Sequence, residues 1–341
     1  MEEYKSFYKD KKILITGGAG AIGTNLTRAL VDLDPAMIIV FDNMVAGYEW
    51  NIPPSKKVLL VKGDVANDID LKRVFNEKPD VVYHLAAFFA NQNSVDYPER
   101  DLDTNGFGTL KVFEYATLSK TERVVYASSG CSIYGHQAPL PLREEFMSMH
   151  LTSPYQITKM LGELYANFFH HHHNLSVVKT RFFNSFGPGE VPGQYRNVIP
   201  NFIYWALKGL PLPIAGNPDA TRDFCYVGDI TDGLLRAGYF ESAIGQEMNL
   251  ASERETRIGD LAELINSLTG NRAGIVMAGK RKWDTKSRLL ASVDRARTLL
   301  GYEPKMDFKE GIKITIEWFK QNWDNIEKSA SFPPGMSSAI R

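Results

Sequence analysis

Tyr155 and Lys159 are four residues apart, within residues 153–159 (SPYQITK). That spacing is about one helical turn, so the two side chains share one face of a helix. A phenol with its ordinary pKa of about 10 is a poor base at neutral pH. A nearby ammonium group favours the phenolate and lowers that pKa. A surface pair would show the same spacing, because Tyr-x-x-x-Lys is common by chance, so a second motif has to decide between the two interpretations.

That second motif is a glycine-rich turn at residues 17–23 (GGAGAIG), directly after the apolar run at residues 13–15. Gly18-x-Gly20-x-x-Gly23 between a strand and a helix is typical of a dinucleotide site, where the pyrophosphate lies at the helix N-terminus. Asp42 ends the next expected strand, where a carboxylate accepts hydrogen bonds from ribose hydroxyls and repels a 2′-phosphate. The motifs together predict a nicotinamide enzyme with a tyrosine acid/base and NAD as its cofactor.

Strands and helices alternate over the first half of the chain. We expect strands at residues 13–15, 37–41, 58–61, 81–85, 123–128 and 177–182, and helices at 22–32, 71–76, 102–119 and 155–173. This alternation predicts an α/β fold with a Rossmann-type doubly wound parallel sheet. After about residue 187, Pro and Gly cluster between short helices such as 201–207 and 258–268. We therefore predict an NAD-binding domain over residues 11–187, a smaller C-terminal α/β substrate-binding lobe over 188–325, and a loosely packed tail over 326–341.

Composition excludes several classes of protein. The 341 residues are 44% apolar with a net charge of −1, so nothing favours nucleic acid or a membrane surface. Two cysteines are too few for a disulfide framework, and no signal peptide or apolar run of about 18 residues is visible. Residues 170–173 are four histidines that point around a whole helix turn and do not converge on one ion. We expect a cytoplasmic protein without a metal site.

With its further motifs, the sequence resembles the extended short-chain dehydrogenase/reductases, specifically the nucleotide-sugar epimerase/dehydratase family (UDP-galactose 4-epimerase-like). The resemblance covers about residues 11–320. Beyond the glycine turn and the Tyr/Lys pair, the motifs that carry it are Phe41-Asp42-Asn43, Gly63-Asp64-Val65, His84-Leu85-Ala86-Ala87, Asn105, Ser128-Ser129 before Tyr134-Gly135, residues 181–188 (RFFNSFGP) and residues 222–229 (RDFCYVGD).

The resemblance implies a role for each matched position. Tyr155 would be the catalytic base and Lys159 would bind the nicotinamide ribose, while Ser129, or Ser128 as the fallback, would hydrogen-bond the sugar 4-hydroxyl. Asp64 would meet the adenine amino group, although turn formation alone would also explain an Asp at this position. The implied cofactor contacts are Gly17, Gly20, Ala21, Ile22, Gly23, Asp42, Asn43, Asp64, Val65, Leu85, Ala86, Ala87, Asn105, Tyr155, Lys159 and Phe182. The implied substrate contacts are Asn184, Asn197, Val198, Arg222 and Arg281.

Structural explanations for three of these substrate contacts stay open. Asn184 could cap a turn, Arg222 could pair with a neighbouring Asp, and Arg281 could be solvated within a basic run. Helices over about residues 103–119 and 155–173 resemble those of a four-helix dimer interface, which implies a homodimer.

The shared first reaction would oxidise the sugar at C4 while Tyr155 takes the hydroxyl proton. The family's 4,6-dehydratases and decarboxylases carry a carboxylate just after the catalytic Ser/Thr, whereas this chain has Gly130-Cys131-Ser132. The resemblance therefore favours a 4-epimerase of a nucleotide-diphosphate sugar, with UDP-hexose as the expected substrate. Cys131 leaves open a C3/C5 epimerase or a 4,6-dehydratase that uses its thiol as acid/base. A dinucleotide sensor without catalysis is the remaining alternative.

Overall fold

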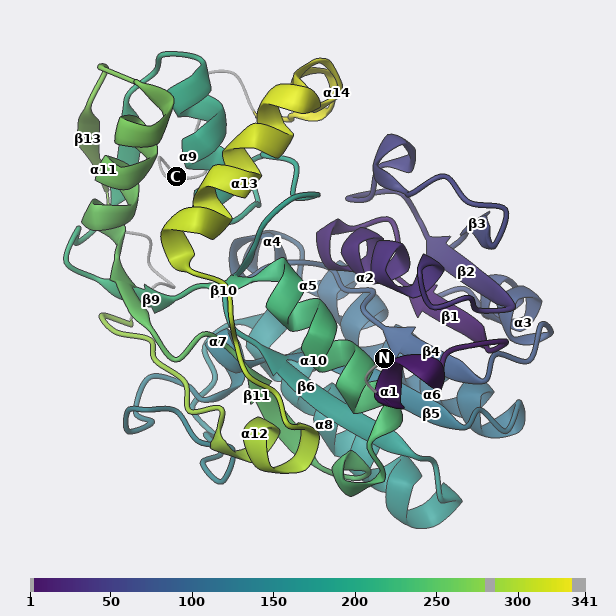
Figure 1. The fold of residues 1–341 in the computed structure, drawn as a ribbon. Helices are drawn as coiled ribbons and strands as arrows, with labels where there is room; N and C mark the ends of the chain where they lie inside the picture. The colour runs from purple at the N-terminus through teal and green to yellow at the C-terminus, as the bar shows by residue number, and fades with distance from the viewer. Residues whose placement is uncertain (1–2, 280–285, 333–341) are drawn as a thin grey trace.

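The computed structural model describes residues 3–279 and 286–332. Its centre is a seven-stranded sheet in which every neighbouring pair of strands is parallel (Figure 1). In spatial order the strands are β11 (Glu247–Leu250), β6 (Val177–Phe182), β5 (Arg123–Ser129), β4 (Val81–His84), β1 (Lys12–Thr16), β2 (Met37–Asp42) and β3 (Val58–Lys62). The predicted Rossmann-type doubly wound sheet is confirmed.

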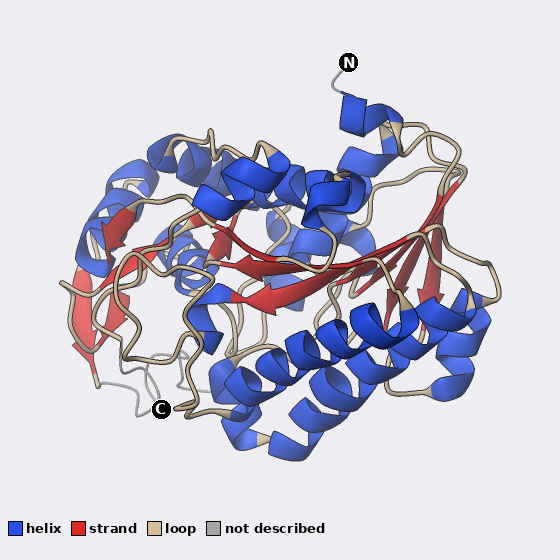
Figure 2. Ribbon diagram, turned by 90° about the horizontal axis from the view of Figure 1, so that it is seen from below, coloured by secondary structure: helices blue, strands red, loops and turns tan. Residues whose placement is uncertain are grey.

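Helices cover both faces of this sheet, as the edge-on view shows (Figure 2). One face is covered by α2 (Ala21–Val31), α10 (Val227–Tyr239) and α12 (Asp294–Leu300), and the other by α3 (Asp68–Phe75), α6 (Thr109–Leu118) and α8 (Pro154–His173). Strand β1 explains the arrangement, since Ile13 and Ile15 pack into the first layer while Leu14 packs into the second. A strand buried on both sides requires an unbroken apolar run, which is the pattern read from the sequence.

Two helix boundaries differ from the expected ones for local reasons. Helix α3 begins at Asp68, earlier than expected, because the Asn67 side chain accepts hydrogen bonds from the first-turn amides and caps the helix. The helix expected over residues 102–119 is two segments, a π-helical stretch η2 (Leu102–Gly108) followed by α6. Such wide turns inside helices are rare and frequently lie at functional sites.

Shorter elements lie around the central sheet. These are α1 (Glu3–Ser6), η1 (Glu49–Asn51), α4 (Asn91–Asp96), α5 (Pro98–Asp101), α7 (Gly130–Ile133), η3 (Glu241–Ala243), and the strand pair β7 (Ser185–Phe186) and β10 (Cys225–Tyr226).

The C-terminal lobe has its own apolar core, which includes Phe202, Ile265 and Ile316. Its elements are α9 (Val198–Leu207), β8 (Leu212–Ala215), β9 (Thr221–Asp223), β12 (Glu255–Arg257), α11 (Ile258–Thr269), β13 (Ile275–Ala278), α13 (Phe308–Gln321) and α14 (Trp323–Ser329). The chain does not divide cleanly at residue 187, however. Strand β11 and helices α10 and α12 return to the sheet, because β11 pairs with the open edge of β6.

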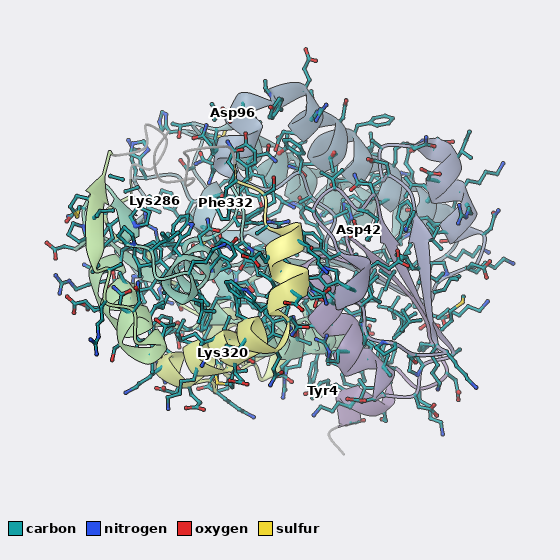
Figure 3. The ribbon with its side chains drawn as sticks, turned by 90° about the horizontal axis from the view of Figure 1, so that it is seen from above. Tyr4, Asp42, Asp96, Lys286, Lys320 and Phe332 are labelled. Carbon is teal, nitrogen blue, oxygen red and sulfur yellow. The ribbon has the colours of Figure 1, made fainter. Side chains whose placement is uncertain are left out.

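The described part of the tail is packed, which corrects the expected loose tail for residues 326–332. Ile326 is fully buried, and Phe332 stacks on Tyr204 with ring centroids 5.6 Å apart. The backbone of Ser331 forms a parallel bridge with Gly193. Figure 3 places Phe332 beside the lobe. Residues 333–341 lie outside the described residues.

Candidate active site

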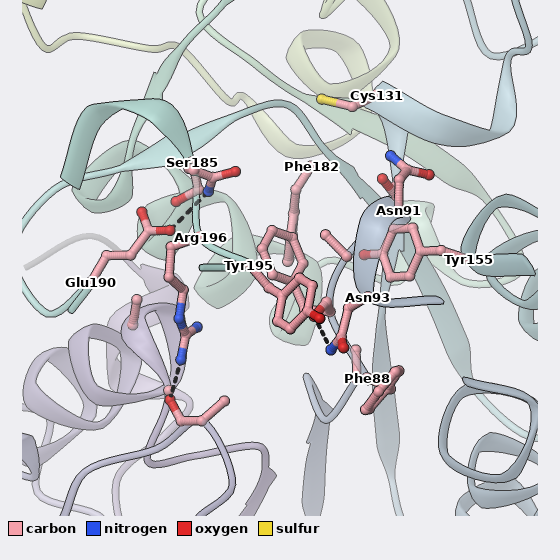
Figure 4. A pocket seen from close by; sticks show the side chains of 18 of the residues that line it. Phe88, Asn91, Asn93, Cys131, Tyr155, Phe182, Ser185, Glu190, Tyr195 and Arg196 are labelled. Carbon is pink, nitrogen blue, oxygen red and sulfur yellow. Dashed lines mark hydrogen bonds between the residues drawn. The ribbon is translucent and has the colours of Figure 1, made fainter. Parts of the chain in front are cut away.

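The two sequence motifs meet at the edge where the strand order of the sheet reverses. Strand β1 lies between β2 and β4, so the connections leaving β1 and β4 diverge to opposite sides. A cavity of about 890 Å³ opens at the carboxyl ends of these strands and continues under the C-terminal lobe. The glycine turn, Tyr155, Lys159 and Arg222 all line this one cavity. Figure 4 shows part of its wall.

The glycine turn brings backbone close to backbone on the cofactor side of the cavity. Gly17 has φ +69°, and a Cβ there would lie 2.6 Å from the backbone nitrogen of Ala86. A Cβ on Gly23 would lie 2.6 Å from the carbonyl oxygen of Gly17. Gly20 is the N-cap residue of α2, and no side chain occupies the helix N-terminus. A helix N-terminus of this kind binds a diphosphate through its free N–H groups and its dipole.

Asp42 lies at the end of β2 and is nearly buried. Its Oδ2 accepts a hydrogen bond from the Ala19 amide at 3.0 Å, and its Oδ1 accepts one from the Met44 amide at 2.8 Å. Burial raises the pKa of Asp42, and these two amides oppose that rise. Each carboxylate oxygen keeps a further lone pair, so the side chain can still accept hydrogen bonds from ribose hydroxyls.

The structure brings nearly all the predicted cofactor contacts to the cavity. Lining residues from that set are Gly17, Gly20, Ala21, Ile22, Gly23, Asp42, Asn43, Asp64, Val65, Leu85, Ala86, Ala87, Tyr155, Lys159 and Phe182. Asp64 accepts a hydrogen bond from Asn43 Nδ2 at 2.8 Å, so its carboxylate is held beside the end of β2.

Asn105 is the exception, because it does not line this cavity. The side chain is buried behind the cavity wall, where its Oδ1 accepts a hydrogen bond from the Phe88 amide at 2.8 Å and its Nδ2 donates to Asp101 at 2.7 Å. Asn105 therefore supports the loop after β4 from behind the residues that line the cavity.

Tyr155 lies in the first turn of α8, whose start is fixed from two sides. Ser153 caps the helix by accepting a hydrogen bond from the Gln156 amide, and Pro154 occupies the first helical position. The Ser153 hydroxyl also donates to Asn91 Oδ1 at 2.6 Å, and the Tyr155 amide donates to Ser94 Oγ at 3.1 Å. Helix α4 thus anchors the turn that carries the phenol.

Lys159 follows one turn later, as expected from its spacing. Its Nζ donates to the carbonyl oxygen of Ala127 at 2.9 Å and lies 5.7 Å from the centre of the Tyr155 ring. Burial lowers the pKa of Lys159 to about 8, because the apolar surroundings disfavour the ammonium. The side chain is therefore close to its titration range at physiological pH.

The Tyr155 pKa differs from the sequence expectation. Burial raises the pKa of the phenol, Asp101 and Cys131 raise it further, and a hydrogen bond with Ser129 lowers it. Desolvation is thus the largest influence on this pKa in the protein alone. The lowered pKa that a base needs requires an additional positive charge, such as the ring of an oxidised nicotinamide.

Ser129, not Ser128, is placed to interact with the phenol of Tyr155. Ser129 lines the cavity with Tyr155 and lowers the pKa of its phenol, and its Oγ donates to Ser132 Oγ at 3.0 Å. Ser128 Oγ donates instead to Glu163 Oε1 at 2.5 Å, and Glu163 forms a buried ion pair with Arg181 at 2.7 Å. Sequence reasoning did not single out Ser132 as a partner of Ser129.

Cys131 lines the cavity, but its thiol is in an unfavourable place for acid/base work. Burial raises the pKa of Cys131 to about 11, so the neutral thiol dominates at neutral pH. Its Sγ accepts a hydrogen bond from the Asn184 amide at 3.2 Å. Lys286, which the sequence did not single out, donates to the Cys131 carbonyl oxygen at 2.7 Å.

On the substrate side, the cavity wall includes Asn184, Asn197, Val198 and Arg222. Asn184 Nδ2 donates to the carbonyl oxygen of Asp223 at 3.0 Å, and Asn197 Nδ2 donates to Glu190 Oε1 at 2.9 Å. Arg222 Nη1 donates to the carbonyl oxygen of Thr221 at 2.8 Å. Arg281 lies outside the described residues.

Two loops that carry no motif close the cavity. Residues 88–93 after β4 form one wall. Across from them, Tyr195 donates to Asp96 Oδ2 at 3.0 Å, and Arg196 donates to the carbonyl oxygen of Ala46 at 2.8 Å. Figure 4 shows Arg196 and Glu190 together, apart from Tyr155. In the sequence, only the aromatic and amide side chains of these loops could have indicated that the loops line the cavity.

Within residues 3–279 and 286–332, no three His, Cys, Asp or Glu side chains converge as metal ligands. Over the same ranges, no helix is both long and apolar enough to cross a bilayer.

A doubly wound sheet, a glycine turn at its switch point and a Tyr/Lys pair beside a serine define the class of nicotinamide-dependent short-chain dehydrogenase/reductases. Residues 13–251 match the sequence model of the NAD dependent epimerase/dehydratase family, and this chain belongs to that family. It is accordingly an enzyme of the epimerase type with NAD as its cofactor.

Individual relatives agree with this assignment. The chain is 33% identical to the UDP-glucose 4-epimerase of Mycolicibacterium smegmatis over 313 residues, which cover 91% of this chain and 98% of the relative. The solved structure of an epimerase from Methanothermobacter thermautotrophicus is 52% identical, with a TM-score of 0.95 over 97% of this chain and 98% of the other. The enzyme WbmF of Bordetella bronchiseptica, solved with NAD⁺ and UDP, is 34% identical, with a TM-score of 0.83 over 95% and 96%.

Proposed function

We propose that this enzyme interconverts the C4 epimers of a nucleotide-diphosphate sugar, with a UDP-hexose as its substrate. The observation that carries the proposal is that Tyr155, Lys159 and Ser129 line one cavity together with the glycine turn and Arg222. The UDP seen in WbmF and the activity of the Mycolicibacterium relative support the uridine nucleotide.

Each residue of the site would have its own role in the first step, the oxidation of the sugar at C4. The Ser129 and Tyr155 hydroxyls would hold the sugar 4-hydroxyl, and the Tyr155 phenolate would accept its proton. Lys159 would bind the nicotinamide ribose and keep a positive charge beside the phenolate. The bound NAD supplies a hydride acceptor and donor at its nicotinamide ring. Asn184, Asn197 and Arg222 would bind the diphosphate, for which the Arg guanidinium is well suited.

The side chains next to C3 and C5 decide what becomes of a 4-ketone. Residues 130–132 include no carboxylate, and the thiol of Cys131 stays protonated at neutral pH because burial raises its pKa to about 11. Glu190 is one buried carboxylic acid of the wall, but it accepts a hydrogen bond from Asn197 and lies near Arg196. Because residues 130–132 offer no base of this kind, the simplest outcome is rotation of the ketone and reduction from its opposite face.

A panel of UDP-, dTDP-, GDP- and CDP-sugars, each incubated with the enzyme and separated by chromatography, tests this function. We expect a UDP-hexose to give an equilibrium mixture of its two C4 epimers. A product that has lost water or CO₂, an epimer at C3 or C5, or no conversion of any sugar would contradict the proposal.

We also propose a homodimer formed through α8 and the η2–α6 segment. Large apolar side chains are exposed along these helices, namely Leu102 (53%), Phe107 (49%), Ile157 (54%), Leu164 (49%) and Phe168 (44%). An apolar face of this kind is typical of a protein interface. Light scattering should give the mass of a dimer, and Leu164→Glu should give a monomer. A monomeric wild-type protein would contradict the proposal.

A further inference from the structure

A buried carboxylate that the proposed reaction does not use lies behind the Tyr155/Lys159 pair. Asp101 ends helix α5 and is 0% exposed. Its Oδ2 accepts a hydrogen bond from Thr158 Oγ1 at 2.7 Å, and its Oδ1 accepts one from Asn105 Nδ2 at 2.7 Å. Thr158 directly precedes Lys159 on α8, so the carboxylate is fixed to the helix turn that carries the lysine.

The hydrogen-bond partners of Asp101 leave its charge uncompensated. Thr158 and Asn105 are both neutral donors, and a buried carboxylate of this kind requires a cation nearby. Lys159 supplies that cation: burial raises the pKa of Asp101 and the Lys159 ammonium opposes that rise, while burial lowers the pKa of Lys159 and Asp101 opposes that fall. Removal of the carboxylate charge would thus make the ammonium harder to keep.

The other titratable groups around Lys159 do not replace Asp101. On α8, Glu163 is already paired with Arg181, and Tyr155 is the base itself. His84 from β4 is neutral, because burial lowers its pKa to about 3, and burial raises the pKa of Tyr126 from β5. Cys131 from α7 is held neutral by burial. Among the described residues that face the lysine, Asp101 is therefore the acidic side chain without a cationic partner of its own.

We propose that Asp101 is the counter-charge of Lys159: it keeps the lysine protonated and, through Thr158, fixes the helix turn that carries the catalytic pair. Asp101 is thus a positioning residue, which acts through Lys159 and touches neither substrate nor cofactor. Its negative charge has opposite effects on the charged forms of Lys159 and Tyr155. It favours the ammonium of Lys159, and it disfavours the phenolate of Tyr155.

This double effect gives the proposal a distinctive pH signature. Activity requires a deprotonated Tyr155, which sets the acid limit, and a protonated Lys159, which sets the alkaline limit. Loss of the negative charge lowers the pKa of both groups. The two limits of the pH profile should therefore move together towards lower pH.

The test compares Asp101→Asn with Glu99→Gln in the NAD-loaded enzyme. Glu99 is an exposed acid on the same short helix, where water screens its charge. We expect Asp101→Asn to shift both limits of the kcat profile to lower pH by at least about half a unit. Glu99→Gln should leave both limits where they are in the wild type. Asp101→Glu, which keeps the charge, should also restore the wild-type limits.

A second readout needs no substrate. Ultraviolet difference spectra against Tyr155→Phe isolate the phenolate of Tyr155, which should appear at lower pH in Asp101→Asn than in the wild type. This titration tests the effect of the Asp101 charge even if the enzyme does not catalyse the proposed epimerisation. Unchanged limits and an unchanged phenolate titration in a folded Asp101→Asn would overturn the proposal. Where Asn is not accommodated, a folded Asp101→Ser answers the same question.

Discussion

The cofactor side of the cavity is built from consecutive strand ends, whereas the substrate side is assembled from distant loops. Gly17, Asp42 and Asp64 follow β1, β2 and β3 in chain order, and each lies where its strand ends. Asn184, Asn197 and Arg222 come from a loop, a helix cap and a short strand of the lobe. The cofactor side therefore depends on local backbone geometry, and the substrate side depends on how the lobe packs against the sheet.

Tyr155 lies between the cofactor side and the substrate side of the cavity. Its substitution should therefore slow the reaction while the binding of NAD and of the nucleotide stays intact. We expect Tyr155→Phe to lower turnover by about 10²–10⁴-fold, because the proton acceptor is removed while the aromatic ring stays buried. NAD content after gel filtration and the affinity for UDP should both match the wild type. Near-normal turnover in the folded variant would remove Tyr155 from the mechanism.

Glu190, on the loop that joins the sheet to the lobe, gives a prediction for stability. Burial raises the pKa of Glu190 to about 7 in the folded protein, above the value of about 4.3 in an unfolded chain. The folded state thus binds this proton more tightly, and the resulting stabilisation is complete below pH 4.3 and is lost as the pH rises through 7. Glu190→Gln has no proton to lose.

The free energy of unfolding of Glu190→Gln, relative to the wild type, should therefore increase by about 3 kcal/mol between pH 4 and pH 8. Denaturant unfolding of both proteins at the two pH values measures it. A difference that does not change with pH would show that Glu190 has the same pKa in both states.

Arg222 tests the substrate side alone. We expect Arg222→Ala to raise KM for the nucleotide sugar about 10–100-fold, since hydrogen bonds to a charged group contribute about 1.5–3 kcal/mol. NAD content should stay unchanged. Arg257→Ala is a matched control, because Arg257 lies on the adjacent strand β12 but pairs with the surface residues Asp219 and Asp260. Equal effects of the two substitutions on KM would contradict a diphosphate contact.

Cys131 should matter least. A thiol that stays neutral contributes no proton transfer, so Cys131→Ala should keep its turnover within about threefold of the wild type. Chromatography of the sugar products measures this. Complete loss of activity in a folded variant with its NAD bound would instead favour proton transfer at C3 or C5.

The contrast between the two sides also explains what the sequence could and could not predict. The glycine turn, Asp42 and the Tyr155/Lys159 pair depend on short-range geometry, and all of them line the cavity as expected. Asn105 has the expected motif, yet it lies behind the wall, because its position depends on the loop after β4. The same limit applies to Asp101, whose burial results from packing of α5 against α8.

Long-range packing accounts for the remaining differences. Strand β11 joins the sheet because β6 offers an open edge, and no pattern within residues 247–250 reports that edge. The raised pKa of Tyr155 likewise reflects burial by several elements. A pattern along the chain specifies which side chains share a face of a helix or strand. It does not specify how far other elements bury those side chains from solvent.

The most direct test of the account is an isotope experiment with UDP-hexose. The enzyme is incubated in D₂O with unlabelled sugar and, separately, in H₂O with sugar that carries deuterium at C4. The account predicts that the product takes up no solvent deuterium at any carbon and keeps its own deuterium at C4. Solvent deuterium at C3 or C5, or loss of the label from C4, would contradict oxidation and reduction at C4 as the whole reaction.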